Sequence, residues 1–338
     1  MKYLRMVMAC LLFLSTAQAQ ETHSYSVFLT AKENVQQLDH PQEFLSERAL
    51  LRREKQNIAV KRSDLPISSD RLEAVEGLVS YKGHHSKWLN SVYVEATTEE
   101  VVALSELSFV KDIVPVSGHM YTTTSINPVY DHGIAADQAH QITLVEGLHN
   151  RGYIGADMII AVLDAGFVGA NTVDFNDYGQ IIATRNFVEG GTNVYQGSSH
   201  GFSVLSTMAA DKNGVFVGTA PFAQYVLVKT EKELSETPQE MYNWIAGAEY
   251  ADSLGADIIN SSLGYSEFDD PDDNYTVDDL DGRTSIISLG AVAAARTGML
   301  VVTSAGNAGG GAWNKLTMPA DADSILTVGS VNQFGIVS

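Results

Sequence analysis

Short apolar runs alternate with helical segments after residue 156, and this rhythm restricts the fold more than any other feature of the chain. The runs are DMIIAVLDAGF (157–167), AQYVLVKT (223–230), ADIINSSLG (256–264), GMLVVTSAGN (298–307) and SILTVGSV (324–331). Helical patterns cover residues 201–210, 238–254 and 285–297. Strands that are apolar on both faces need helices on both sides, which is typical of a parallel sheet. We therefore predict a three-layer α/β domain over residues 131–338, with functional groups beyond the carboxyl ends of its strands.

The region before residue 120 has a different pattern and predicts a separate, smaller α+β domain over residues 20–120. It contains alternating strand patterns at 24–30, 89–96 and 109–116, and helical patterns at 43–55 and 97–107, the first of them strongly charged. Residues 117–130 are polar and have no clear period. We interpret residues 121–130 as a linker, a kind of segment that proteases cut readily.

Residues 1–19 have the parts of a secretory signal peptide. Lys2 and Arg5 supply the positive start, residues 6–14 the short apolar run, and Ala17-Gln18-Ala19 the small-residue cleavage site. No other run approaches the length of a membrane span, so we expect no membrane span in the exported protein. The single cysteine, Cys10, lies inside this segment, so the exported protein would have no disulfides and would be secreted or held at the cell surface.

The net charge excludes one group of partners. The formal charge of the 338-residue chain is −20, with most of the acidic excess after residue 120. Nucleic acids and anionic membranes would both be repelled by such a surface, so neither is expected as a partner.

Three polar features interrupt the apolar rhythm and are candidates for chemistry. Asp164 ends a buried run, where a carboxylate is costly unless it is hydrogen-bonded, although it could simply cap the next turn. His200 opens a helix as a general base would, although a lone histidine is more often structural. The loop SAGNAGGG (304–311) follows an apolar strand and offers the Asn307 carboxamide to a developing negative charge, or forms a plain turn.

A rival interpretation places the nucleophile at Ser199, because GSSHG (197–201) fits the G-x-S-x-G pattern of a nucleophile elbow. An elbow needs a strand directly before the serine, but NFVEGGTNVYQG (186–197) is polar and glycine-rich. We therefore favour His200 over Ser199 as the chemical residue.

Taken in order along the chain, these motifs resemble the subtilisin-like serine proteases (subtilases, peptidase family S8), whose triad runs Asp, His, Ser. The resemblance covers roughly residues 126–338. Its motifs are IAVLDAGF, with DAG where DTG or DSG is commoner, SSHGFSVLSTMAA, with HGF where HGT is usual, INSSLGY, VVTSAGN and LTMPADADSILTVGSV. The region before residue 120 resembles the inhibitory prosegments of these proteases.

The resemblance implies a role for each matching residue. Asp164 would orient His200 and stabilise its imidazolium, and His200 would take the proton from a serine hydroxyl. Asn307 would donate to the oxyanion. An extended polypeptide substrate would add a strand beside Ser261, Leu263 and Gly264 on one side, with Ala305 and Gly306 across the cleft. The chain's own prosegment would act as an intramolecular inhibitor.

The given residues depart from the family in one respect. The family's nucleophile lies in a G-T-S motif downstream of the last predicted strand, and no such motif occurs before Ser338. We expect a fragment of a secreted serine endopeptidase, itself inactive because the nucleophile is missing. The alternative is a catalytically dead, subtilase-like peptide-binding protein.

A serine endopeptidase of this kind requires no cofactor, although the sequence has one candidate site for calcium as a structural ion. Residues 267–282 (EFDDPDDNYTVDDLDG) crowd acidic side chains into one loop, without the spacing or closing glutamate of an EF-hand. Both a non-standard calcium site and a solvated acidic insertion fit this loop. The pairs His84-His85 and His132, His140 are interpreted as surface histidines, so no metal ligand is assigned.

Overall fold

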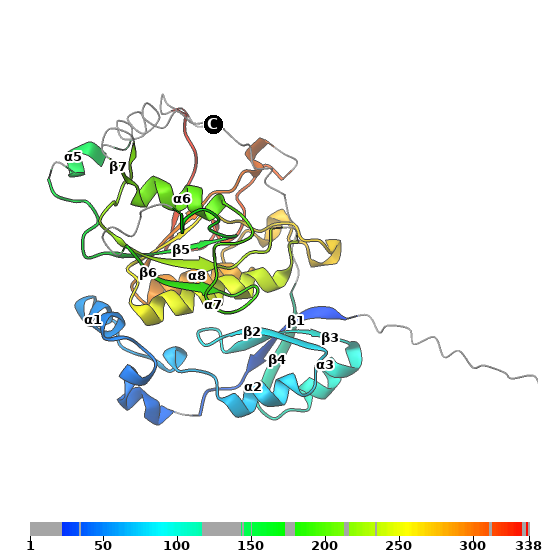
Figure 1. The fold of residues 1–338 in the computed structure, drawn as a ribbon. Coiled ribbons are helices and arrows are strands. Elements are labelled where there is room, and N and C mark those ends of the chain that lie inside the picture. Colours follow the sequence, from blue (N-terminus) through cyan, green and yellow to red (C-terminus); the bar gives the residue numbers. More distant parts are fainter. Residues whose placement is uncertain are drawn as a thin grey trace, which may run out of the picture.

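A computed structural model describes residues 22–33, 35–116, 143, 145–149, 151–172, 180–212, 216–233, 235–310, 313–332 and 336. The larger part of it is built on a six-stranded sheet with the order β12-β11-β10-β5-β9-β6, and every paired neighbour is parallel (Figure 1). The strands are β5 (Ile159–Asp164), β6 (Ile181–Asn186), β9 (Gln224–Lys229), β10 (Ile258–Ser261), β11 (Leu300–Ser304) and β12 (Leu326–Val328). The predicted parallel α/β domain is confirmed.

Helices cover both faces of this sheet, which gives the predicted three layers. α6 (His200–Ala209) packs on one face through Leu205 and Ala209. α7 (Pro238–Leu254) and α8 (Ile286–Arg296) pack on the other face, where Trp244 and Ile287 join the larger apolar core. The sheet is thereby buried on both sides, as the apolar strands require.

Local sequence signals set the ends of α7. Thr237 and Glu240 form a capping box at its start, and Pro238 occupies the first turn, where a missing N–H is harmless. Gly255 caps the carboxyl end of the helix directly after Leu254, and its φ of 85° is in the left-handed region. The predicted bounds, 238–254, coincide with the observed ones.

The structure contains one strand of this sheet that the sequence reading missed. β6 lies at the sheet edge, where three of its six residues are half-buried, two are exposed and Asn186 is buried. Its sequence, IIATRN, includes an arginine and an asparagine, so it lacks the continuous apolar run that marks a central parallel strand.

The smaller part is an antiparallel sheet with the order β2-β3-β1-β4, as expected for an α+β domain. Its strands are β1 (His23–Leu29), β2 (Tyr81–Ser86), β3 (Ser91–Ala96) and β4 (Val110–Pro115), and its helices α1 (Glu47–Lys55), α2 (Ser69–Glu76) and α3 (Thr98–Ser105). Neither β2 nor α2 was predicted. β2 reads YKGHHS, which has no apolar alternation, so its pairing with β3 defines it as a strand.

The two parts meet along α7, whose outer side lies against the antiparallel sheet (Figure 1). The Glu249 carboxylate of α7 accepts hydrogen bonds from the Ser86 hydroxyl and from the Lys87 and Trp88 N–H groups. The Tyr242 hydroxyl donates to the Ser26 hydroxyl of β1 at 2.7 Å. The contact therefore contains satisfied polar groups in addition to the shared apolar core.

The remaining elements are short. They are α5 (Val145–His149), β7 (Asp211–Lys212), β8 (Phe216–Val217) and the 3₁₀ turns Val35–Asp39, Pro41–Glu43, Arg62–Asp64, Pro271–Asp273, Val277–Asp279 and Ala308–Gly310. Among the described residues, no helix has both the length and the apolarity to cross a bilayer. The predicted signal peptide (1–19), the linker (121–130), His132 and His140 lie outside the described residues.

Candidate active site

Asp164 and His200 are hydrogen-bonded to each other at the carboxyl edge of the parallel sheet. Asp164 is the last residue of β5, and His200 is the first residue of α6. The His200 Nδ1 atom lies 2.8 Å from Oδ1 and 3.0 Å from Oδ2 of Asp164. The carboxylate is fully buried, whereas the histidine side chain is 49% exposed. One ring nitrogen is thus held by the carboxylate, and the ring remains accessible.

Two glycines allow this approach. Gly201 follows His200, and its N–H donates to the Gly166 carbonyl at 3.0 Å. A Cβ on Gly201 would lie 2.6 Å from that carbonyl oxygen and 2.8 Å from the Asp164 Cβ. Gly166 has a φ of 149°, and a Cβ there would lie 2.5 Å from the Gln196 carbonyl oxygen. The glycines of the DAG and HGF motifs therefore serve to bring α6 against the end of β5.

The surroundings shift the proton affinity of both groups. Burial raises the pKa of Asp164, and the hydrogen bonds from His200 and from the Ala165 N–H oppose this effect. The hydrogen bond to Asp164 raises the pKa of His200, while partial burial of the ring lowers it. The net effect is a raised pKa of the His200 imidazole. The pair is arranged to stabilise an imidazolium once it forms.

The other predicted site residues follow the neighbouring strands. β10 pairs with β5 and β11 so that Ser261 lies opposite Leu163 and Thr303. The ends of these strands therefore share the edge that carries Asp164. Asn307 lies three residues beyond β11 and is exposed, as a donor to a substrate would have to be.

The residues assigned to the two sides of a substrate lie close together around Thr317. A Cβ on Gly264, after β10, would lie 2.0 Å from the Thr317 Oγ1 atom, and a Cβ on Gly306, after β11, would lie 2.4 Å from it. The Thr317 N–H donates to the Ala305 carbonyl. Thr317 lies in the LTMPADADSILTVGSV motif, and the sequence predicts no role for it, because its place between the two segments depends on tertiary structure. Its hydroxyl is buried without a partner.

Ser261 and Leu263 have different environments. The Ser261 side chain is fully buried, and its Oγ accepts a hydrogen bond from the Trp244 indole N–H at 2.9 Å. Leu263 is half-buried and packs against the larger core. Ser261 therefore fixes the strand end, while residues 262–264 continue past the sheet.

The structure does not support the nucleophile-elbow interpretation of Ser199. The residues from Phe187 to Ser199 form bends and loops and contain no strand. Ser199 precedes α6, and its hydroxyl makes no capping hydrogen bond. The strand-turn-helix geometry that would activate such a serine is missing in this fully described segment.

Three carboxylates form a tight cluster near the same edge. Glu231, Glu236 and Glu240 offer oxygen atoms that all lie within 4.8 Å of one another, the one such group among the described residues. Glu231 and Glu240 are buried, and Glu231 accepts a hydrogen bond from the Tyr265 hydroxyl. Burial raises the pKa of Glu231 to about 7, of Glu236 to about 9 and of Glu240 to about 10. This group has the oxygen ligands that Ca²⁺ prefers, and protons neutralise it when no cation is bound.

We expect Glu236→Gln to stabilise the protein at alkaline pH. Burial and the neighbouring carboxylates raise the pKa of Glu236 to about 9 from its ordinary 4.5. Between these values the folded protein holds a proton that the unfolded chain releases, so the free energy of unfolding falls as the pH rises. The neutral glutamine removes this loss. The melting temperature of the variant should exceed that of the wild type by several degrees at pH 9 and equal it near pH 4.

The matched control is Glu233→Gln, which alters an exposed carboxylate in the same loop. The melting temperature of Glu233→Gln should differ from that of the wild type by the same amount at pH 4 and at pH 9. An equal pH response in both variants would contradict the assignment of the raised pKa to Glu236.

The aspartates of the acidic loop hold its turns together. The Asp279 carboxylate accepts from the Thr276 N–H and hydroxyl, and Asp281 accepts from the Arg283 and Thr284 N–H groups. Within residues 267–282, all of which are described, no three carboxylates converge as metal ligands would. Calcium at this loop stays a prediction, and these hydrogen bonds favour the interpretation of an acidic insertion.

Comparison with known families assigns both parts of the chain. The sequence model described as the Subtilase family matches residues 155–335. The model described as the Peptidase S8 propeptide domain of Bacteroidota matches residues 24–128. The first match includes every predicted site residue, and the second covers the whole antiparallel sheet except His23.

Individual relatives agree with the larger match. Subtilisin E of Bacillus subtilis is 36% identical over 191 residues, which are 55% of this chain and 44% of that protein. The alkaline protease of Shouchella clausii is 28% identical over 256 residues, 74% of this chain and 57% of its own length. The chain thus spans about half the length of these relatives.

A solved structure extends the similarity to the fold of both parts. The epidermin leader peptide processing serine protease (EpiP) of Staphylococcus aureus aligns with a TM-score of 0.56 at 16% identity. The alignment covers 94% of this chain and 71% of that one. At this identity the likeness concerns the fold alone.

Proposed function

The chain belongs to the subtilase family, and from this premise we propose that its full-length form is a secreted serine endopeptidase made as an inhibited precursor. The observation that carries the proposal is the hydrogen bond between buried Asp164 and accessible His200. In this proposal the nucleophilic serine comes from sequence beyond residue 338. Residues 1–19 direct export, and the region before residue 120 is the inhibitory prosegment.

The proposed mechanism assigns one step to each group. His200 accepts the proton of the serine hydroxyl while the serine oxygen attacks the carbonyl carbon of the peptide bond. Asp164 holds the ring by its Nδ1 atom and stabilises the imidazolium. The imidazolium then gives its proton to the leaving amine, and the acyl-enzyme is hydrolysed by water with the same base. The residues after β10 and β11 bind the polypeptide substrate as an added strand.

Covalent labelling of the full-length gene product tests this function. A fluorophosphonate probe should label one serine outside residues 1–338, and the processed protein should hydrolyse casein. The unprocessed protein should react more slowly, because the prosegment protects the site. Failure of the processed, folded protein to label or hydrolyse would favour the alternative, a peptide-binding protein without catalysis.

We expect Asn307→Ala to lower kcat by about 10²–10³-fold with little change in KM. The carboxamide would donate to the oxyanion, a charge that exists only in the transition state and its intermediate, so ground-state binding should be spared. Steady-state kinetics on a peptide anilide would measure both constants. If kcat were unchanged and KM rose by the same factor, Asn307 would instead be assigned to substrate binding.

A further inference from the structure

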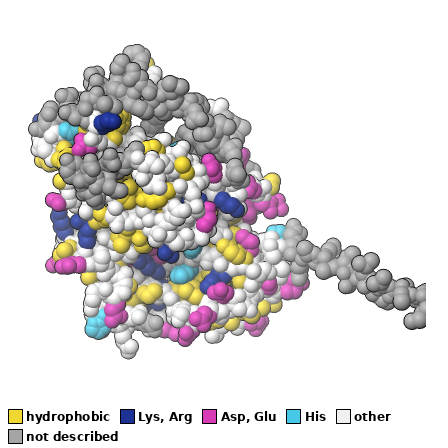
Figure 2. Space-filling model, viewed as in Figure 1, with side chains coloured by type: hydrophobic (Ala, Val, Ile, Leu, Met, Phe, Trp, Pro, Cys, Tyr) yellow, Lys and Arg dark blue, Asp and Glu magenta, His cyan; other side chains and the backbone are white. Residues whose placement is uncertain are grey.

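The last turns of α7 and α8 form a polar surface that is covered by α1. We call it the acceptor surface, and we define it by Asp252, the carbonyl groups of Gly255, Ala256, Thr297 and Gly298, and the Asp257 carboxylate. Helix α1 lies against it at the left of Figure 1, and Figure 2 shows basic side chains gathered along the same edge of the molecule.

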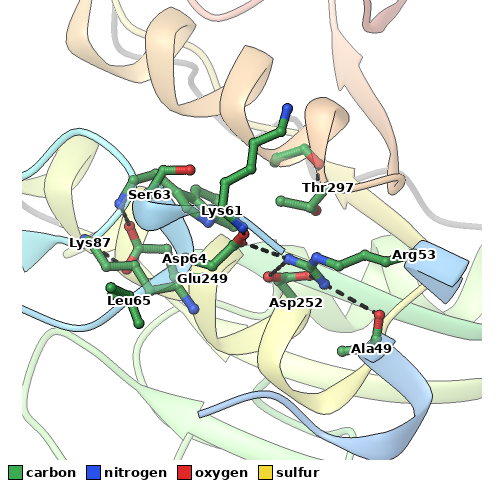
Figure 3. A network of polar contacts seen from close by, with 12 residues as sticks. Ala49, Arg53, Lys61, Ser63, Asp64, Leu65, Lys87, Glu249, Asp252 and Thr297 are labelled. Carbon is green, nitrogen blue, oxygen red and sulfur yellow. Dashed lines mark hydrogen bonds and ion pairs between the residues drawn. The ribbon is translucent and has the colours of Figure 1, made fainter. Parts of the chain in front are cut away.

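Two buried arginines of α1, Arg52 and Arg53, form the centre of the contact, and Figure 3 shows Arg53 beside Asp64 and Asp252. Arg53 binds the Asp252 carboxylate as a fork, with NH1 3.0 Å from Oδ1 and NH2 2.7 Å from Oδ2, and its NH2 also donates to Asp64 at 3.0 Å. Arg52 pairs with Asp252 and donates to the carbonyls of Ala256 and Thr297. Both guanidinium groups and the Asp252 carboxylate are almost completely buried.

A rim of further contacts surrounds this centre. Arg48 pairs with Asp257 and donates to the carbonyls of Gly255 at 3.0 Å and Asp157 at 2.6 Å. The Gln56 carboxamide donates to the Gly298 carbonyl at 2.9 Å. The fit to Gly255 is close, since a Cβ on this glycine would lie 2.6 Å from the Arg48 Cβ.

In the contacts that Arg48, Arg52, Arg53 and Gln56 make here, the larger part of the protein supplies the acceptors. The last carbonyls of a helix have no partner within it, and its C-terminal end carries a partial negative charge. α7 adds an aspartate to that end and has no basic residue in its last turn. Alone, these groups repel one another, and arginine is the side chain whose planar fork satisfies a carboxylate and carbonyls together.

The acceptor surface lies far from the candidate active site. Asp157 precedes β5 and Asp257 precedes β10, whereas Asp164 and Ser261 end those strands. A strand of six residues spans about 16–20 Å, so the two surfaces lie at opposite edges of the sheet. A ligand at one edge does not touch the other.

We propose that the acceptor surface is a docking site for an arginine-bearing helix, and that α1 uses it to hold the prosegment on the catalytic domain independently of the active site. The inference rests on the proposed function for the identity of residues 24–116 as a prosegment. It adds an arginine contact at the far ends of α7 and α8, separate from the contact that the antiparallel sheet makes with α7, and this contact contributes to the affinity of the prosegment for the catalytic domain.

The test separates the two parts without using the chain's own activity. A recognition site for a specific protease is inserted after Thr123 in full-length protein that also carries His200→Ala. After external cleavage, the dissociation constant of the two pieces is measured by surface plasmon resonance. The double variant Arg52→Met, Arg53→Met should weaken binding by roughly 100-fold or more, because the Asp252 carboxylate stays buried without partners.

Arg62→Met is the matched control, since Arg62 is exposed in the same segment, and it should bind as the wild type does. Arg53→Lys keeps the positive charge but loses the forked pair of hydrogen bonds to Asp252. Its dissociation constant should therefore lie between those of the wild type and the double variant. If the double variant does not fold before cleavage, Arg48→Met, which removes a partly exposed side chain, should still weaken binding about 10-fold. Binding unchanged in the folded variants would overturn the inference, whereas absence of serine labelling would overturn only the proposed function.

Discussion

Replacing His200 by alanine in the full-length chain should lower kcat by about 10⁶-fold, the scale measured for other triads of this kind. Without the imidazole, no group can accept the serine proton, and the hydroxyl is a weak nucleophile at neutral pH. Release of the prosegment should stop as well, since the same site would make that cut. Peptide anilide hydrolysis and gel analysis of the precursor measure the two effects.

Ser199→Ala is the control for this result. Ser199 adjoins His200 but makes no capping hydrogen bond, so its removal should leave most of the activity and processing. If Ser199→Ala abolished both while His200→Ala spared them, the assignment of the general base would be wrong and the elbow interpretation would return.

Asp164→Asn should lower kcat by about 10⁴-fold. The amide is nearly the same size, so the fold of the site is kept. However, an amide can donate its own N–H to Nδ1, which stabilises the wrong tautomer, and it cannot stabilise the imidazolium. The effect should be on kcat with little change in KM, since Asp164 is buried beneath the histidine and does not reach the substrate.

The pH profile distinguishes this role from a merely structural one. The Asp164 hydrogen bond raises the pKa of His200, and only neutral histidine is a base, so wild-type kcat/KM should rise as the pH increases through that pKa. Asp164→Asn removes the cause of the raised pKa, so the acidic limb should move to lower pH. If the remaining activity of Asp164→Asn showed its acidic limb at the same pH as the wild type, Asp164 would not act on His200.

Much of the larger domain could be predicted from the sequence. Continuous apolar runs marked β5, β9, β10, β11 and β12, and their alternation with helices gave the parallel sheet, because each signal is local to its own segment. β6 and β2 were missed for the opposite reason. Their sequences carry no distinct pattern, and pairing with a neighbouring strand defines them.

The candidate site was predicted in part. The order of Asp164, His200 and Asn307 along the chain pointed to a shared edge, and the structure joins the first two by a hydrogen bond. Thr317 and the Glu231 cluster received no role, because each becomes distinctive only through residues that come from other elements. The glycines at 166 and 201 show the same limit, since the atoms that exclude a side chain there belong to distant turns.

Helix α1 shows most clearly what the sequence determined alone and what only the tertiary structure decided. The pattern of residues 43–55 predicted a charged helix, because helix formation depends on neighbours one turn away. It could not predict that Arg52 and Arg53 would be buried while Leu51 is 55% exposed. Which side chains of α1 are buried depends on Asp252, 199 residues after Arg53, and on the carbonyl groups at two helix ends. Burial of a charge is stable only where its partners are already in place, and the folded chain alone brings them there.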